Sequence, residues 1–269
     1  MDKNTKIALT EEKETLFITL RAKALDSRSK HSVLHDDTAY EILKSVNYDF
    51  NKYAKSSDAL TVVRARQFDE WIKEYIEANN NAVVVYIGCG LDTRITRIAP
   101  PSSVYWYDLD FPEVIDVRKS FYTDKDGYHM MASSATEAAW LTQIPNDKPV
   151  LIIAEGVLEY FTFEEVKTLF SRLLEHFKKG EMIFDVMNTF AANAGKKGLK
   201  ETTGAEYKWA VNDTSVISTI NPRLQKITEL PLMKSVYVRK LSFKSRLIYG
   251  LMACIPQTKN MLRLMRYKF

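Results

Sequence analysis

Short apolar runs alternate with stretches of helical periodicity through the middle of the chain. The apolar runs cover residues 83–87, 104–110, 128–137, 149–154 and 181–187. Before the last run, apolar residues recur at helical spacing from Val166 to Phe177, behind a capping-box pattern at Thr162 and Glu165. This alternation predicts an α/β fold with a doubly wound, mostly parallel sheet.

The flanking regions have a different pattern. Apolar residues at helical intervals, such as Leu16, Leu20, Phe68 and Ile72, predict that residues 1–80 are mostly helical. The polar stretch 193–200 predicts a mobile loop or a helix junction.

A glycine turn follows the first apolar run. Gly88 and Gly90 let the backbone approach a ligand, and Asp92 and Thr93 are expected to cap the helix that follows. Thr93 occupies the third glycine position of a dinucleotide fingerprint, and Asp92 would bring negative charge toward a pyrophosphate. The turn therefore favours a cationic ligand such as S-adenosylmethionine over NAD, although an ordinary glycine turn has the same pattern.

Acidic residues stand at the ends of two later runs, 104–110 and 149–154. Asp110, and as a second choice Asp108, can accept hydrogen bonds from ribose hydroxyls at the tip of the second strand. The alternative is that Asp110 only caps a helix beginning at Pro112. Glu155, followed by Gly156, comes directly after the run 149–154. Because burying a charge without a partner is costly, we expect this carboxylate to do more than fill space in the core.

Together these segments resemble the leucine carboxyl methyltransferase family, in particular its bacterial branch of S-adenosylmethionine-dependent O-methyltransferases of polyketide biosynthesis. The resemblance implies a class I methyltransferase, Rossmann-like fold with an N-terminal helical lid. The motifs that carry it are at 21–22, 27–28, 49–50, 64, 68–69, 88–94, 108–115 and 155–160.

The resemblance also implies roles for single residues in holding S-adenosylmethionine. Gly88, Gly90 and Asp92 would line its methionine and ribose portion, and Asp110 would hold the ribose hydroxyls. Glu155 and Gly156 would lie beside the sulfonium and amino groups. Arg64 would pair with the carboxylate, assisted by Arg21. Ser134 stands where many relatives have an aspartate for the adenine amino group.

Composition fits an ordinary globular enzyme. The chain has 269 residues, a net charge of +4, 46% hydrophobic and 27% charged residues, and two cysteines. We expect one domain over 1–269, divided into a helical lid or flank at 1–80, a cofactor-binding core at 81–190 and a substrate-side insertion with a basic C-terminal part at 191–269. The absence of a signal-peptide pattern at residues 1–6, of a membrane-spanning apolar run and of a disulfide framework predicts a cytoplasmic protein.

The C-terminal part has an uneven charge. Residues 234–269 contain nine basic residues and no acidic one, together with apolar residues such as Leu247 and Leu251. This segment is either a final strand and helix packed on the core, which we favour, or a basic amphipathic surface for a membrane or an acidic partner. Nucleic acid is not expected as a partner, and no oligomeric state is predicted.

The predicted reaction is a direct transfer of the sulfonium methyl to a carboxylate or hydroxyl of a small molecule, polyketide-like or another secondary metabolite. A hydroxyl acceptor needs a group that takes its proton, and no catalytic residue is identified, Tyr160 being a weak candidate. No metal ligand is assigned. The alternatives are a degenerate methyltransferase fold that only binds, methylation of a protein C-terminal carboxylate, and an NAD-dependent oxidoreductase.

Overall fold

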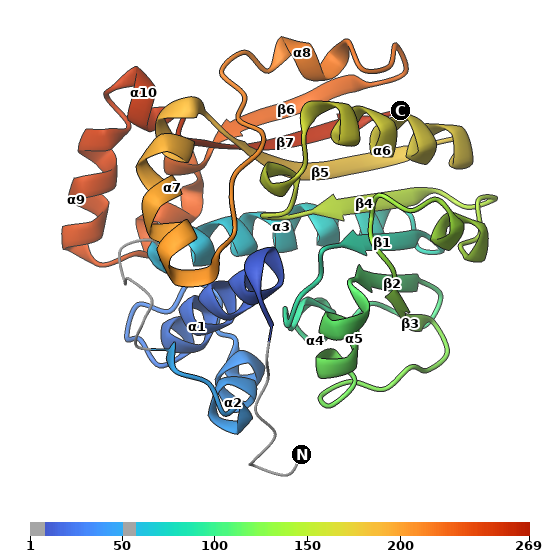
Figure 1. Ribbon diagram of the computed structural model, residues 1–269, viewed down its shortest axis with the longest axis horizontal. Coiled ribbons are helices and arrows are strands. Elements are labelled where there is room, and N and C mark those ends of the chain that lie inside the picture. Colours follow the sequence, from blue (N-terminus) through green and yellow to red (C-terminus); the bar gives the residue numbers. More distant parts are fainter. Residues whose placement is uncertain (1–8, 51–57) are drawn as a thin grey trace.

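A single seven-stranded sheet forms the centre of the protein (Figure 1). The computed structural model describes residues 9–50 and 58–269. The strand order is β3-β2-β1-β4-β5-β7-β6, in which β1 to β5 are parallel and β7 is antiparallel to β5 and β6. The strands are β1 (Val83–Ile87), β2 (Tyr105–Asp110), β3 (Tyr128–Ala132), β4 (Val150–Ala154), β5 (Gly180–Met187), β6 (Gln225–Pro231) and β7 (Leu262–Lys268).

Helices cover both faces of the sheet, which is why the central strands are apolar throughout. In β1, Val83 and Val85 pack in one hydrophobic cluster with α6 (Phe163–His176), while Val84 and Tyr86 pack in another with α3 (Asp58–Ala78). All residues of β1 and β4 are buried. The predicted doubly wound, mostly parallel α/β sheet is confirmed.

The α6 helix begins as its sequence predicts. The Thr162 hydroxyl accepts a hydrogen bond from the Glu165 amide, and the Glu165 carboxylate accepts one from the Thr162 amide. The predicted apolar positions Val166, Leu169 and Leu173 face the sheet and are buried.

The N-terminal region is helical, as predicted, over the residues that the structure describes. It contains η1 (Glu11–Thr15), α1 (Leu16–Ser27), α2 (Asp37–Ser45) and α3. Leu16 and Leu20 of α1 form a hydrophobic cluster with Leu91 of the glycine turn and with Val114 of α5 (Pro112–Arg118). These helices therefore lie over loops at the carboxyl ends of the strands. Residues 1–8 and 51–57, which belong to the predicted helical region, lie outside the described residues.

Three local predictions are wrong. The strand expected at 128–137 ends at Ala132. The stretch 193–200, expected as a loop or junction, lies inside α7 (Thr189–Thr203), which begins at an Asn188 side-chain cap. The helix after the glycine turn, α4 (Arg94–Ile98), has no side-chain cap, because the Thr93 hydroxyl bonds Asp36 and Asp92 forms ion pairs instead.

In the C-terminal part, the predicted final strand is confirmed, whereas the predicted packing of the helix on the core is only partial. The predicted strand is β7, which lies between β5 and β6. In α9 (Phe243–Met252), however, Tyr249 is buried whereas Phe243, Leu247 and Leu251 are exposed. A membrane or partner contact of this helix stays a prediction. Among the described residues, no helix is both long and apolar enough to span a bilayer.

The remaining elements are short or lie near the C-terminus. Figure 1 shows α10 near α7 and α9, on the left of the view. These elements are η4 (Ala139–Gln143), η5 (Leu158–Tyr160), α8 (Ser215–Ser218), η6 (Leu232–Lys234), η7 (Val236–Lys240) and α10 (Pro256–Lys259).

Replacing the cap residue of α6 tests its contribution to stability. Thr162→Ala removes the side-chain acceptor of the capping box, so we expect the free energy of unfolding to fall by about 1 kcal/mol in urea titrations. Thr168→Ala, at an exposed position inside the same helix, is the matched control and should leave stability unchanged or slightly higher. Equal effects of the two substitutions would contradict the assigned cap.

Candidate functional site

The carboxyl ends of three neighbouring strands meet at one edge of the sheet. Ile87 pairs with Leu109 in β2 and with Ala154 in β4. The residues that follow these positions, Gly88, Asp110 and Glu155, are therefore brought side by side by the strand register. Open α/β sheets bind ligands at this edge.

A narrow cavity of about 90 Å³, here called the strand-end cavity, opens at this edge. Leu16 and Thr19 of α1 and Phe111 also line it. Seven of the nine residues predicted to hold the cofactor line it: Arg64, Gly88, Gly90, Asp92, Asp110, Glu155 and Gly156.

Two glycines at this cavity leave no room for a side chain. Gly88 has φ +67°, and a Cβ there would lie 2.7 Å from Cγ2 of Val157. Gly156 also has φ +67°, and a Cβ there would lie 2.9 Å from Nη2 of Arg64. Both positions therefore require glycine on conformational and steric grounds.

Asp110 braces the glycine turn. Its carboxylate accepts hydrogen bonds from the backbone amides of Gly90 at 2.7 Å and Phe111 at 2.8 Å. It does not cap α5, whose first turn has no side-chain cap. Burial raises the pKa of Asp110 to about 6, against the lowering effect of these two amides.

Asp108, the second choice for the ribose, lies away from the cavity. It is fully buried, forms an ion pair with Arg118, and accepts hydrogen bonds from Tyr128 Oη and Trp106 Nε1, each at 2.8 Å. Arg118 in turn donates to the Gly90 and Asp92 carbonyls at 3.0 and 2.7 Å. Asp108 therefore contributes to the glycine turn indirectly, because it holds the Arg118 side chain that donates to the carbonyls of the turn.

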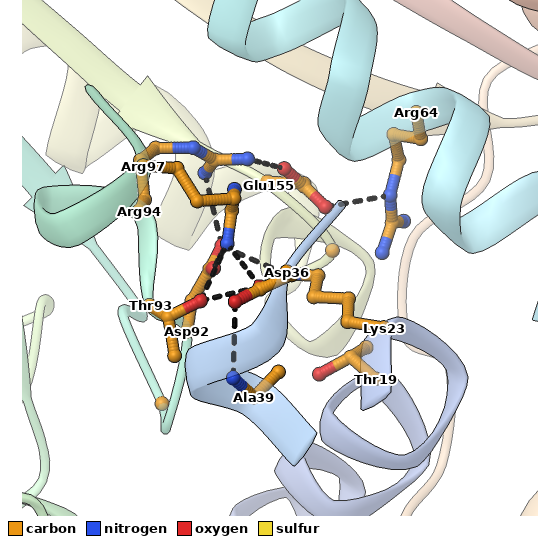
Figure 2. Close-up of polar contacts among 12 residues, drawn as sticks. Thr19, Lys23, Asp36, Ala39, Arg64, Asp92, Thr93, Arg94, Arg97 and Glu155 are labelled. Atoms are coloured by element: carbon orange, nitrogen blue, oxygen red, sulfur yellow. Dashed lines mark hydrogen bonds and ion pairs between the residues drawn. The ribbon is translucent and has the colours of Figure 1, made fainter. Parts of the chain in front are cut away.

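A buried cluster of ion pairs includes Lys23, Arg64, Asp92 and Glu155, which line the strand-end cavity (Figure 2). Arg94 of α4 pairs with Asp69 of α3 at 2.8 Å and with Glu155. Arg97 pairs with Asp69 at 2.8 Å and with Asp36, which precedes α2, at 2.7 Å. The cluster thus joins α2, α3, α4 and the end of β4.

Asp92 is the centre of this cluster. Its carboxylate lies 2.8 Å from Lys23 Nζ of α1 and 2.7 Å from Arg97 Nη1, and accepts a hydrogen bond from Tyr86 Oη at 2.9 Å. Although burial opposes ionisation, these cations hold the pKa of Asp92 well below its usual range. Asp92 therefore remains a carboxylate at neutral pH.

Arg64 is shared between two carboxylates. Its Nε lies 3.1 Å from Glu155 and its Nη1 lies 2.9 Å from Asp185 of β5. The pKa of Arg64 is raised by these carboxylates despite burial. Glu155, between Arg64 and Arg94, has a lowered pKa against the effect of its own burial.

Two of the predicted residues do not line the cavity. Arg21 forms an ion pair with Asp58 at 3.0 Å. Ser134 Oγ lies 2.8 Å from Thr136 Oγ1, in the loop after β3. The structure does not bring either side chain together with the other seven residues.

A second cavity, of about 640 Å³ and here called the wide cavity, adjoins the first. Both are lined by Thr15, Thr19, Arg64, Gly156 and Tyr160. The wide cavity is otherwise mostly apolar and is also bounded by residues of α7 and α9, together with Tyr207, whose ring stacks on Tyr160 with 5.9 Å between centroids.

Sequence reasoning missed several charged residues of this region. Lys23, Arg97 and Asp36 had no spacing signal, since their partners are far away in the chain. Arg94 was part of a recognised motif but received no role, and the same is true of Glu159 at the wide cavity. Among the described residues, no group of three or more His, Cys, Asp or Glu side chains is placed to hold a metal.

Comparisons with solved structures agree with a class I methyltransferase fold. A DUF574 family protein from Streptomyces avermitilis superposes with a TM-score of 0.59 at 10% identity, covering 90% of this chain and 98% of that one. The plantazolicin methyltransferase BamL superposes with a TM-score of 0.52 at 9% identity, covering 96% and 98%. At these identities the likeness concerns the fold alone.

Comparisons of sequence define the family. The leucine carboxyl methyltransferase model matches residues 16–174. The tetracenomycin polyketide synthesis O-methyltransferase TcmP of Streptomyces glaucescens is 33% identical over 98% of both chains. The S-adenosyl-L-methionine-dependent methyltransferase dpfgK of Gibberella zeae is 29% identical over 82% of both. The chain belongs to the leucine carboxyl methyltransferase family, and it is an S-adenosylmethionine-dependent methyltransferase.

Removing Arg94 tests how much the buried cluster stabilises the fold. Arg94→Met leaves the carboxylates of Asp69 and Glu155 without their shared cation, so we expect unfolding free energy to fall by about 3–5 kcal/mol. Lys44→Met, which breaks an exposed pair with Glu41, should cost less than about 0.5 kcal/mol. Urea titrations measure both, and an equally small loss in both variants would contradict the structural role of the cluster.

Proposed function

We propose that the protein transfers the methyl group of S-adenosylmethionine to a carboxylate or hydroxyl oxygen of a small, largely apolar molecule. The observation that carries this proposal is the shared wall of the two cavities, at Arg64, Gly156 and Tyr160. A cofactor in the strand-end cavity and an acceptor in the wide cavity would meet at this wall.

The strand-end cavity has suitable chemistry for the cofactor. Asp110 offers carboxylate oxygens at the tip of β2, where ribose hydroxyls can donate to them. The buried cluster of ion pairs at this cavity combines four cations (Lys23, Arg64, Arg94 and Arg97) with five carboxylates (Asp36, Asp69, Asp92, Glu155 and Asp185). When all are ionised, one negative charge is in excess, which favours a ligand with a net positive charge.

The volume implies that α1 moves when the cofactor binds. A cavity of about 90 Å³ is smaller than the ~300 Å³ of small ligand sites. Leu16 and Thr19 of α1 line this cavity, so a movement of α1 would enlarge it. We therefore assign the N-terminal helices the role of a lid, the region 81–190 that of the cofactor-binding core, and the region 191–269 that of the acceptor side.

The acceptor side favours a flat or apolar molecule. The wide cavity, of about 640 Å³, falls within the usual size range of small-molecule sites, and Tyr160 and Tyr207 form an aromatic wall. A polyketide-like aromatic compound matches this shape, and the relative TcmP is named as an O-methyltransferase of polyketide synthesis, which supports the same class of acceptor.

The protein's own residues contribute mainly by positioning. Bound S-adenosylmethionine supplies an electrophilic methyl group on its sulfonium. Arg64, held by Glu155 and Asp185, fixes the wall between the two cavities, and Leu16 and Thr19 of α1 line the strand-end cavity. Burial raises the pKa of Tyr160 well above its usual value, so its hydroxyl stays protonated and is unsuited to act as a base.

Turnover with aromatic acceptors tests the proposed function. The purified protein is incubated with S-adenosylmethionine and matched naphthalene, anthracene and anthraquinone compounds that bear a hydroxyl or a carboxyl group. Release of S-adenosylhomocysteine together with an O-methylated product is the expected result. Cofactor binding without any methylated product across this series would instead support a degenerate binding protein.

The pH dependence of cofactor binding tests Asp110. Because only the ionised carboxylate accepts two ribose hydroxyls and its pKa is about 6, the dissociation constant for S-adenosylhomocysteine should rise about tenfold between pH 7 and pH 5. Asp92 and Glu155 have lowered pKa values and should stay ionised in this window. Calorimetry on Asp110→Asn should show weaker binding with little change over the same range, and an equally steep change in this variant would exclude Asp110 as the titrating group.

A further inference from the structure

A stripe of large apolar side chains is exposed along α9. Phe243, Leu247 and Leu251 are 77%, 56% and 63% exposed. They are four residues apart, so they follow one another along one side of the helix, and Ile255, between α9 and α10, is exposed as well. Of the ten large hydrophobic side chains that are exposed among the described residues, six lie within 236–255. Such a concentration marks an interaction surface.

Positive charge accompanies this stripe. Lys244 and Arg246 are exposed on α9 itself. Lys234, Arg239 and Lys240 are exposed in η6 and η7, two short helices that contact α9. None of the ion pairs in the described part of the chain involves these five cations. The stripe and these cations are here called the α9 face, which lies at the periphery of the molecule, on the left of Figure 1.

Carboxylates near the α9 face do not neutralise this charge. Residues 234–269 contain no acidic residue. Glu70, which is hydrogen-bonded to η7, forms an ion pair with Arg66 at 3.1 Å. The pKa of Tyr249 in α9 is raised by burial and by the charge of Asp58, but Asp58 forms an ion pair with Arg21 at 3.0 Å. The α9 face therefore combines an apolar stripe with uncompensated positive charge.

The inner side of α9 belongs to the wide cavity. Ser245, Ile248, Tyr249 and Met252 line this cavity. Ile248 is also 45% exposed, so the wall of the cavity and the exposed surface meet at this residue. Whatever covers the α9 face consequently lies next to the wide cavity.

We propose that the α9 face docks the protein on a membrane surface that contains anionic lipids. The apolar stripe enters the boundary between headgroups and acyl chains, and the cations lie at the lipid phosphates. A second copy of the chain fits less well, because pairing two α9 faces brings two sets of unpaired cations together. A nucleic acid would contact the cations but leave the apolar stripe in water.

The wide cavity favours a membrane over an acidic protein. It is mostly apolar, and an apolar molecule that enters it also partitions into the bilayer, so docking brings the cavity to the place where such a molecule accumulates. This argument rests on the proposed function, whereas the exposure and charge of the α9 face do not depend on it.

Sedimentation with lipid vesicles tests the docking without cofactor or acceptor. The wild type should bind vesicles of phosphatidylcholine and phosphatidylglycerol in equal parts at least about tenfold more tightly than vesicles of phosphatidylcholine alone, and high salt should remove most of this difference. Leu247→Ser combined with Leu251→Ser should weaken binding at least about tenfold. Ile227→Ser, at an exposed apolar position of β6, is the matched control and should bind like the wild type.

The cations are tested by their own variants. Lys244→Gln combined with Arg246→Gln should lower the preference for anionic vesicles at least about fivefold. Lys178→Gln combined with Lys179→Gln, at exposed positions directly before β5, is the matched control and should keep the preference. All four side chains are exposed, so the midpoints of urea unfolding should stay unchanged.

A probe on Cys254 reports which face touches the lipid. Cys254 is exposed just after α9, whereas Cys89 is buried, so a thiol-reactive nitrobenzoxadiazole dye labels Cys254 selectively. Its emission should rise and shift to the blue when anionic vesicles are added. The same dye on the variant with serine at both leucine positions should show little change.

Other results would overturn the proposal. Equal binding to both kinds of vesicle would contradict the role of the cations, and binding that the double serine variant retains would contradict the role of the stripe. Absence of binding to either vesicle would leave an acidic protein as the occupant. A dimer in light scattering that the same variant abolishes would assign the α9 face to a second copy. None of these measurements needs turnover, so each outcome leaves the methyltransferase proposal as it is.

Discussion

The ion pairs of Arg94 with Asp69 and Glu155 are the constraint on which the site depends. Arg94 is fully buried, and its two carboxylate partners come from α3 and from the end of β4. Isolated charges at this depth would be prohibitively costly, so the turn after β1, α3 and the end of β4 have to keep their relative positions. The glycine turn and Asp110 are then held where the strand ends meet.

The same cluster links the N-terminal helices, the proposed lid, to the core. Lys23 brings α1 to Asp92, and Asp36 brings the start of α2 to Arg97. The proposed movement of α1 on cofactor binding would therefore act directly on the Lys23–Asp92 pair. In the proposed function, the excess carboxylate of the cluster would favour the positive charge of the cofactor, so that binding would be coupled to the ion pairs of the N-terminal helices.

Sequence patterns predicted what is local and missed what is distant. The apolar run at 83–87 predicted β1 because both of its faces are covered, and the spacing of Thr162 and Glu165 predicted the start of α6. The expected cap at Asp92 and Thr93 failed because Lys23, Asp36 and Arg97, which no local spacing connects to the turn, hold these side chains. Glu159 stood in a recognised motif, but its burial beside the wide cavity is visible only in three dimensions.

A crystal structure of the protein with S-adenosylhomocysteine tests the central claim most directly. The account predicts the ribose hydroxyls on Asp110, the amino-acid end of the ligand toward Glu155 and Arg64, α1 displaced, and the pairs of Arg94 with Asp69 and Glu155 unchanged. A ligand bound elsewhere, or one that binds by breaking the Arg94 pairs, would contradict it.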